Sequence, residues 1–329
     1  MPSADLPRAP RPDAPARSRA RGRPASHHVI AVLLGLAALV GLAVSGIVPG
    51  LLPSPTVEPA PGPTTALASG SATAADPGST GAARATPSAS PSVPKGPLTL
   101  VGLGDSVPSA ETCGCTGFVE QTGSRLGQLT HRGWVVHNDA NGGWTTADVA
   151  DDLASAPTRD HLAGADLVVV EVGANDFNLD RVEDSSCFPA AGSACWSSTV
   201  TGLRDGLTQI IQTVRSIDHR PDLRIALLGY WNITVDGSVG RALGQSYVLG
   251  SDALTRLVNQ TIQQVATTTG AVYVDAYSPL KGPTGTRDPT GDLLFDGDHP
   301  NADGHALLAG AVVDQLLTTG AVPAWTAAP

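Results

Sequence analysis

Four short segments of the chain carry the side chains best suited to chemistry, and each follows an apolar run. Together they supply a serine, a pair of glycines, an asparagine and an aspartate three residues before a histidine. Such a set contains a nucleophile, a base and hydrogen-bond donors. The segments are Gly104-Asp105-Ser106, Asn138-Asp139-Ala140-Asn141-Gly142-Gly143, Gly173-Ala174-Asn175-Asp176 and Asp296-Gly297-Asp298-His299-Pro300.

The serine and the histidine suit acyl transfer. A serine hydroxyl is a poor nucleophile until a base takes its proton, and a neutral imidazole can do this near pH 7. We therefore expect Ser106 to be the nucleophile and His299 to be its base. The imidazole also needs an acceptor on its second nitrogen. Asp296 is favoured for that place, with Asp298 as the alternative carboxylate.

Acyl transfer also needs donors that face the negative charge of the tetrahedral intermediate. The backbone N–H groups of Ser106 and Gly143 and the side-chain amide of Asn175 are the candidates, with Gly142 as a close competitor of Gly143. This chemistry implies no metal and no organic cofactor.

The elements that must position these groups form an alternating pattern. Short apolar runs alternate with helical stretches, which is typical of a parallel sheet covered on both faces. We expect a three-layer α/β/α sandwich with about five strands, whose strand-end loops carry the site. The expected strands are 98–103, 134–137, 166–172, 223–228 and 271–274, and the expected helices lie near 117–129, 146–154, 198–217, 251–268 and 302–319.

In chain order, the four segments resemble the four sequence blocks of the SGNH (GDSL-like) hydrolase superfamily, over about residues 98–320. The resemblance implies a flavodoxin-like fold, a Ser-His-Asp triad, a three-donor oxyanion hole and a serine ester hydrolase. That hydrolase would be a carboxylesterase, a lipase or a carbohydrate deacetylase. The residues that match the blocks are Ser106 of the GDS block, Gly143 of the second block, Asn175 of the G-x-N-D block, and Asp296 and His299 of the D-x-x-H block.

Two departures qualify the resemblance. Val107 stands where the family often has leucine after the serine. The segment also lacks the second glycine of G-x-S-x-G, which argues against the nucleophile elbow of α/β-hydrolases.

Other residues near these blocks have structural interpretations. Ser106 alone could cap the helix that follows it. Asp105 is expected to be a structural hydrogen-bonding residue, and Asp176 to anchor its loop. Trp144 and Trp231 would either line a cleft or pack. His305 is expected to be an ordinary residue of the last helix, and the remaining histidines of this region to lie at the surface: His131, His137, His161 and His219.

The four cysteines predict disulfides rather than a metal site. They do not have zinc-ligand spacing, and disulfides are the default in an oxidising compartment. Four cysteines allow three connectivities. We favour Cys187 with Cys195, and Cys113 with Cys115; the second pairing resembles related actinobacterial-type SGNH sequences.

The first 97 residues indicate export. Residues 1–28 carry six Arg against two Asp, and residues 29–48 are uncharged, which predicts a basic cytoplasmic end before a transmembrane signal anchor within 29–52. A cleaved signal peptide is the alternative, with a cut near Ala43–Ser45 or Ala66–Ala68. Residues 53–97 are rich in Pro, Ala, Ser, Thr and Gly and predict a disordered linker. The hydrolase domain, 98–329, would then lie outside the cell, anchored or secreted.

Charge limits the partners of this domain. Residues 98–329 hold 12 Lys and Arg against 26 Asp and Glu, so a nucleic-acid partner is excluded. The expected substrate is a small ester, a lipid or an acetylated glycan. The loops 230–250, with Tyr230-Trp231-Asn232, and 276–295 are the expected walls of the site. The alternative function is an envelope glycan-binding or acyl-transferring protein with little hydrolysis.

Overall fold

The computed structural model describes residues 96–182, 184, 187 and 194–326. The predicted basic end, the apolar segment within 29–52 and nearly all of the predicted linker therefore lie outside the described residues. Among the helices that are described, none has the length and apolar character needed to cross a membrane.

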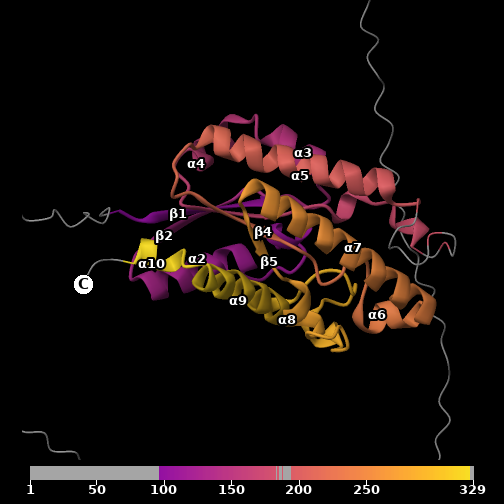
Figure 1. Ribbon diagram of the computed structural model, residues 1–329. Helices are drawn as coiled ribbons and strands as arrows, with labels where there is room; N and C mark the ends of the chain where they lie inside the picture. The colour runs from indigo at the N-terminus through magenta and orange to yellow at the C-terminus, as the bar shows by residue number, and fades with distance from the viewer. Residues whose placement is uncertain (1–95, 183, 185–186, 188–193, 327–329) are drawn as a thin grey trace, which may run out of the picture. The chain divides into compact units, whose positions relative to one another are not determined.

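Five parallel strands form one sheet, which confirms the predicted three-layer α/β/α sandwich (Figure 1). The order across the sheet is β2-β1-β3-β4-β5. Each strand lies within a residue or two of its expected range. The strands are β1 (Leu98–Gly104), β2 (Trp134–Asn138), β3 (Leu167–Glu171), β4 (Arg224–Leu228) and β5 (Val272–Val274).

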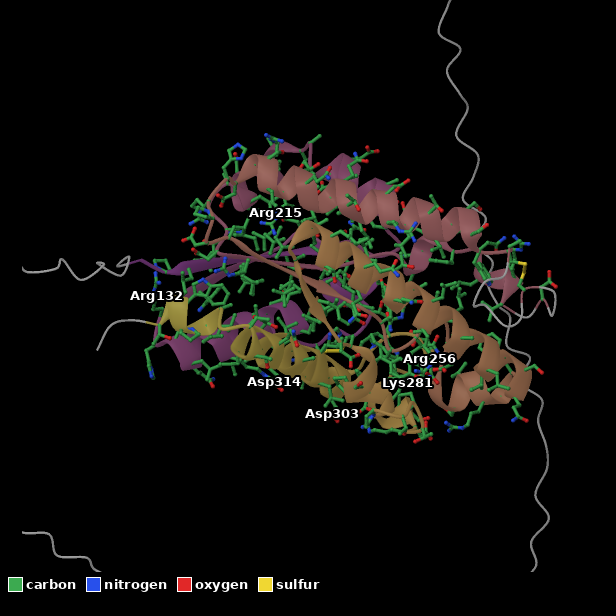
Figure 2. The ribbon with its side chains drawn as sticks, viewed as in Figure 1. Arg132, Arg215, Arg256, Lys281, Asp303 and Asp314 are labelled. Atoms are coloured by element: carbon green, nitrogen blue, oxygen red, sulfur yellow. A yellow bond between two sulfur atoms is a disulfide. The ribbon has the colours of Figure 1, made fainter. Side chains whose placement is uncertain are left out.

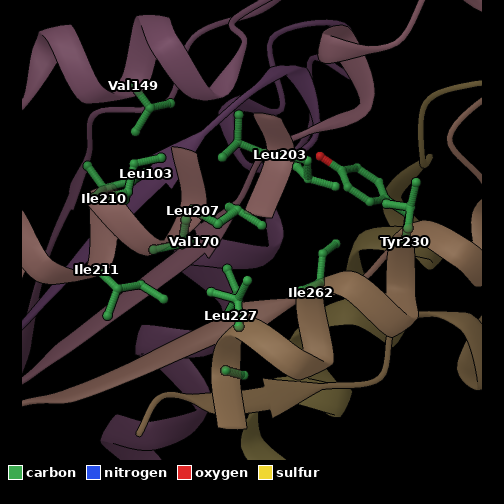
Figure 3. Packing of buried hydrophobic residues seen from close by; sticks show 14 of the residues in the cluster. Leu103, Val149, Val170, Leu203, Leu207, Ile210, Ile211, Leu227, Tyr230 and Ile262 are labelled. Atoms are coloured by element: carbon green, nitrogen blue, oxygen red, sulfur yellow. The ribbon is translucent and has the colours of Figure 1, made fainter. Parts of the chain in front are cut away.

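Helices cover both faces of this sheet because successive strand residues point to opposite sides. On β3, Val168 and Val170 belong to one buried cluster, while Leu167 and Val169 belong to the other. Figure 3 shows the first cluster, in which side chains of β1, β3 and β4 meet those of two long helices. That layer contains α3 (Thr146–Asp152), α4 (Ala156–Leu162), α5 (Ser197–Ile217) and α7 (Gln245–Thr269), and the opposite layer contains α2 (Phe118–Thr130), α8 (Tyr277–Lys281), α9 (Ala302–Thr318) and α10 (Val322–Trp325).

The two expected loop walls are more helical than the sequence analysis predicted. The 230–250 segment contains α6 (Gly237–Ala242), and α7 begins at Gln245 rather than near 251. Asp236 starts α6 by accepting a hydrogen bond from the N–H of Gly237, and Gly244, at φ 102°, separates the two helices. Gly237 and Gly244, which favoured a loop interpretation, therefore mark the starts of α6 and α7 instead.

The 276–295 segment likewise contains α8 and a 3₁₀ turn at Pro289–Asp292. The sequence analysis also missed α4. Ser155 caps that helix by accepting from the N–H of Thr158, and a proline lies in its first turn, where proline is tolerated.

The strand order places a crevice between β1 and β3. The chain passes from β1 outward to β2 and then returns to β3 on the other side of β1. Loops that leave two neighbouring strands in opposite directions open a gap at their carboxyl ends, which is where α/β sheets of this kind bind ligands. The Ser106 and Asn175 segments follow β1 and β3, so this crevice is the place to examine for a site.

Candidate active site

Ser106 begins a short helix directly after β1. This helix, α1 (Ser106–Ser109), is capped by Asp105, whose carboxylate accepts from the N–H of Val107 at 3.1 Å. The capping interpretation of Ser106 is therefore wrong, because the residue before it takes that role. Ser106 is left with a partly exposed hydroxyl at the head of the helix.

Gly104 makes the sharp exit from β1 possible. It adopts φ 146°, and a Cβ at this position would lie 1.9 Å from the carbonyl oxygen of Glu171. That carbonyl accepts the N–H of Asp105 at 3.1 Å. Any residue with a side chain would separate β1 from β3 here, and the place of the serine would change with it.

The hydroxyl, the imidazole and one carboxylate form a continuous line. The Oγ of Ser106 lies 3.0 Å from Nε2 of His299, and Nδ1 of His299 lies 2.8 Å from Oδ2 of Asp296. Both are hydrogen-bond distances. The nearest oxygen of Asp298 lies 4.0 Å from the same Nδ1, which leaves Asp296 as the hydrogen-bonded partner of the ring.

Asp296 is held as an ionised acceptor. Partial burial raises the pKa of its carboxyl, but hydrogen bonds from the N–H groups of Asp298 and His299 and from the His299 ring outweigh burial, so that the net pKa is lowered. The carboxylate is therefore charged at neutral pH where it faces Nδ1 of the His299 ring.

A buried ion pair supports the turn that carries this carboxylate. The N–H of Asp236 donates to the carbonyl oxygen of Gly297 at 2.7 Å, and the carboxylate of Asp236 accepts from Nζ of Lys281 at 2.7 Å. Lys281 is only 4% exposed. Lys281 of α8 and Arg256 of α7, both labelled in Figure 2, lie over the ring of Tyr277, at 5.5 and 4.7 Å from its centroid. The hydrogen bond from Asp236 to Gly297 thus links the turn of Asp296 and His299 to this ion pair.

The loops after β1 and β2 offer unpaired backbone donors near the serine. The N–H groups of Ser106, Gly142 and Gly143 have no acceptor within the described part of the chain. Residues 141–144 form a turn closed by the N–H of Trp144, with Gly143 at φ 79°. This conformation requires glycine at position 143. A Cβ on Gly142 would lie 3.9 Å from the Cβ of Ser106, which is an ordinary van der Waals contact, so position 142 does not require glycine in the same way.

The loops after β2 and β3 are joined to each other. The amide of Asn175 donates one hydrogen to the carbonyl oxygen of Trp144 at 2.9 Å, which leaves its second hydrogen free. Asp176 accepts from the N–H and the hydroxyl of Thr146, at 3.0 and 2.6 Å. Asp176 thus anchors loops, as predicted, and the donor amide of Asn175 keeps a defined orientation.

Tyr230 joins the loops after β1 and β3 from beneath. Its hydroxyl donates to Oδ2 of Asp105 at 2.6 Å and accepts from the N–H of Ala174 at 3.4 Å. The backbone of Tyr230 is itself held by two hydrogen bonds with the amide of Asn259. The sequence analysis placed Tyr230 only as a cleft wall, because nothing in the sequence identifies this cross-strand contact.

Two carboxyls are buried together under the nucleophile. Burial raises the pKa of Asp105 to about 6, although hydrogen bonds from Tyr230 and Val107 oppose the shift. Glu171 is fully buried, neither of its oxygens has a hydrogen-bond partner, and burial and then the charge of Asp105 raise its pKa well above the usual range. A charge on Glu171 would be costly in this environment, because no hydrogen bond or cation among the described residues compensates it.

A small cavity opens beside Ser106. Its volume is about 40 Å³, and Tyr230, Trp231 and Asn232 are among its walls, as expected. Trp231 both lines this cavity and packs in the core, at 1% exposure. A larger cavity of about 830 Å³ lies at the β5 edge, and its lining contains none of the residues of the site.

The remaining expectations have mixed outcomes. Disulfides join Cys113 to Cys115 and Cys187 to Cys195, as favoured. His161 is not a simple surface residue, because it pairs with Asp139 at 2.9 Å and stacks on His137. His305 does lie in the last helix, but it is 1% exposed.

Comparisons with known proteins assign the chain to a family. The model of the GDSL-like Lipase/Acylhydrolase family matches residues 103–307. Among solved structures, the lipase Lip_vut3 from a goat rumen metagenome is similar at 16% identity and a TM-score of 0.53, over 66% of this chain and 97% of that one. Axe2, an acetylxylan esterase from Geobacillus stearothermophilus, is 20% identical with a TM-score of 0.47, over 67% of this chain and 95% of its own. No curated protein sequence matches.

The buried carboxyl of Asp105 predicts a pH-dependent cost in stability. Below its unfolded pKa of 3.8 the group is protonated in both states, and above about 6 it is ionised in both. Between these values the folded state binds the proton more tightly, so stability falls as pH rises, by up to about 3 kcal/mol.

Asp105→Asn removes this titration. The free energy of unfolding of each protein is measured by denaturant titration from pH 4 to 7. The value for the variant minus the value for wild type should increase as pH rises. The opposite titration of buried His305 is present in both proteins and cancels. A difference between the two proteins that stays constant with pH would contradict the assignment.

Proposed function

We propose that this chain, which belongs to the GDSL-like lipase/acylhydrolase family, hydrolyses ester bonds through a triad of Ser106, His299 and Asp296. The observation that carries the proposal is the 3.0 Å contact between the Ser106 hydroxyl and Nε2 of His299. Nδ1 of the same ring faces an ionised carboxylate, so the ring is held in the tautomer that can accept a proton from the serine.

The reaction follows from the direction of these contacts. His299 takes the hydroxyl proton as the Oγ of Ser106 attacks the ester carbonyl carbon, and the carbonyl oxygen becomes an oxyanion. When the C–O bond breaks, the imidazolium gives its proton to the leaving alcohol. Water, deprotonated by the same ring, then releases the acyl group from the serine. Asp296 stays ionised and stabilises the imidazolium in both steps.

The oxyanion would be held by three loops at once. The N–H groups of Ser106 and Gly143 and the free hydrogen of the Asn175 amide are the proposed donors. None of them needs to abandon an existing hydrogen bond to bind the substrate. Donors that are already oriented cost no reorganisation when charge develops, which is how such sites lower the barrier.

The small cavity supports a preference for short acyl groups. Its 40 Å³ is room for only a few water molecules, since one occupies roughly 10–15 Å³ on this measure. Most of its walls are buried core residues such as Ile233. An acetyl group fits such a space and a long chain does not, so acetyl esters, including acetylated glycans, are the proposed substrate class.

The N-terminal sequence supports action outside the cytoplasm. The uncharged stretch 29–48 after an arginine-rich segment is the sequence feature behind this proposal. The disulfides at 113–115 and 187–195 suit an oxidising compartment. The domain would then meet its substrate at the cell surface or beyond, whether it is anchored or released.

The triad predicts unequal effects of the two neighbouring aspartates. Asp296→Asn keeps the shape of the side chain but stabilises the wrong tautomer of the His299 ring. The kcat for p-nitrophenyl acetate should therefore fall by about 10⁴-fold. Asp298→Asn, the matched control, changes a half-exposed carboxylate 4.0 Å from the ring and should change kcat less than about tenfold. Equal losses in both variants, or the larger loss in Asp298→Asn, would reverse the assignment.

The cavity predicts a steep dependence on acyl length. The kcat/KM for p-nitrophenyl esters should be highest for acetyl and fall by at least about tenfold from acetyl to octanoyl, since one misfitting methylene costs about 1–3 kcal/mol. Leu179 lines the cavity but is 37% exposed, so Leu179→Ala should enlarge the space without damaging the core and should flatten this series. An unchanged series in the variant, or a wild-type preference for octanoyl, would refute the acyl-pocket assignment.

A further inference from the structure

Two cysteines and a histidine from distant parts of the chain meet on the α2–α9 side of the sheet. Cys113 and Cys115 lie in the loop between α1 and α2, and His305 lies in the first turns of α9. One ligand atom of each residue, the two sulfurs and a ring nitrogen, lies within 4.8 Å of the others. In the structure the two sulfurs form a disulfide.

His305 is an unusual member of this cluster. Its side chain is 1% exposed, it stacks on Phe118, and its Nδ1 has no hydrogen-bond partner. Buried polar atoms without a partner are uncommon and call for an explanation. An imidazole nitrogen without a hydrogen-bond partner can offer its lone pair, and the neutral ring is the form that ligates metals.

We propose that reduction of the Cys113–Cys115 disulfide turns this cluster into a binding site for one thiophilic divalent cation, held by two thiolates and the imidazole of His305. Two sulfurs and one nitrogen are a ligand set typical of Zn²⁺, and ligands of a tetrahedral zinc lie roughly 3.5–3.8 Å apart. Both cysteines are partly exposed, so water can occupy the fourth position.

The chemistry balances with a phosphine as reductant. The phosphine gives two electrons to the disulfide and takes the oxygen of one water molecule, which yields the thiols of Cys113 and Cys115 and the phosphine oxide. Binding of M²⁺ then displaces one proton from each thiol, while neutral His305 contributes its lone pair without losing a proton. The oxidised chain offers only the imidazole and should not bind.

The sequence did not predict this site because its ligands do not share a motif. Zinc motifs pair Cys or His residues a few positions apart with a second such pair. Here Cys113-Gly114-Cys115 is not followed by a second such pair, and the third ligand, His305, lies near the other end of the hydrolase domain in the sequence. The packing of α2 against α9 brings the two parts together, with Phe118 and His305 in contact.

Co²⁺ is the probe for the test, because thiolate–cobalt charge transfer is visible by absorption. The full chain, reduced with a phosphine that leaves no competing thiol, should bind one Co²⁺ with this band, and Zn²⁺ should displace it. The unreduced chain should show no band. His305→Phe keeps a ring against Phe118 but removes the ligand, and should weaken binding at least about 100-fold.

Two control variants separate this site from the others. Cys187→Ser/Cys195→Ser removes the second disulfide and should leave the cobalt band intact, whereas Cys113→Ser/Cys115→Ser should abolish it. His219→Gln changes an exposed histidine and should have no effect. Two results would overturn the proposal. One is equal binding by His305→Phe and wild type, and the other is loss of the cobalt band in the Cys187→Ser/Cys195→Ser variant.

Wild-type protein gives a second test that needs no variant to fold. After reduction, Zn²⁺ should slow alkylation of Cys113 and Cys115 by iodoacetamide by at least about tenfold, as read from peptide masses, and should leave Cys187 and Cys195 at their metal-free rates. Unchanged rates at Cys113 and Cys115 would also overturn the proposal.

Discussion

The hydrogen bond between the hydroxyl of Ser106 and the imidazole of His299 is the contact on which the account depends. It joins two residues that lie 193 positions apart, yet such a bond contributes only about 0.5–1.5 kcal/mol of net stability. A contact this weak cannot hold two loops in place. The loops must therefore be positioned by the rest of the fold, and most of the structure near the carboxyl ends of the strands can be understood in those terms.

Three separate supports provide that positioning. Gly104 lets β1 and β3 approach closely enough for Asp105 to cap α1 beside Glu171. The hydroxyl of Tyr230 then joins the loops after β1 and β3. The ion pair of Lys281 with Asp236 holds the turn of Asp296 and His299. Each support places polar or charged groups in the interior, where hydrophobic residues would be less costly. The molecule thus departs from simple core packing where its proposed chemistry is located.

The sequence predicted the sheet and the site but not these supports. Apolar runs with β-branched residues mark the strands. Motifs after β1, β2 and β3, and a fourth just before α9, mark Ser106, Gly143, Asn175 and His299. Helix α6 was missed because its glycines favour loops in isolation. The supporting roles of Tyr230 and Lys281 and the cluster that includes His305 were missed for a different reason. Their roles come from partners in distant elements, and no local pattern of residue types encodes a contact between α2 and α9, or between the loops after β1 and β4.

Covalent labelling tests the central claim most directly. A fluorophosphonate reacts fastest with a serine whose proton is taken by a nearby base. The position of its adduct, located by peptide mass, and its dependence on His299 therefore report whether residues 106 and 299 meet in solution. We predict one adduct per chain, on Ser106, with a rate that falls by about 10⁴-fold in His299→Ala. An adduct on a different residue, or the same rate of labelling in that variant, would contradict the account.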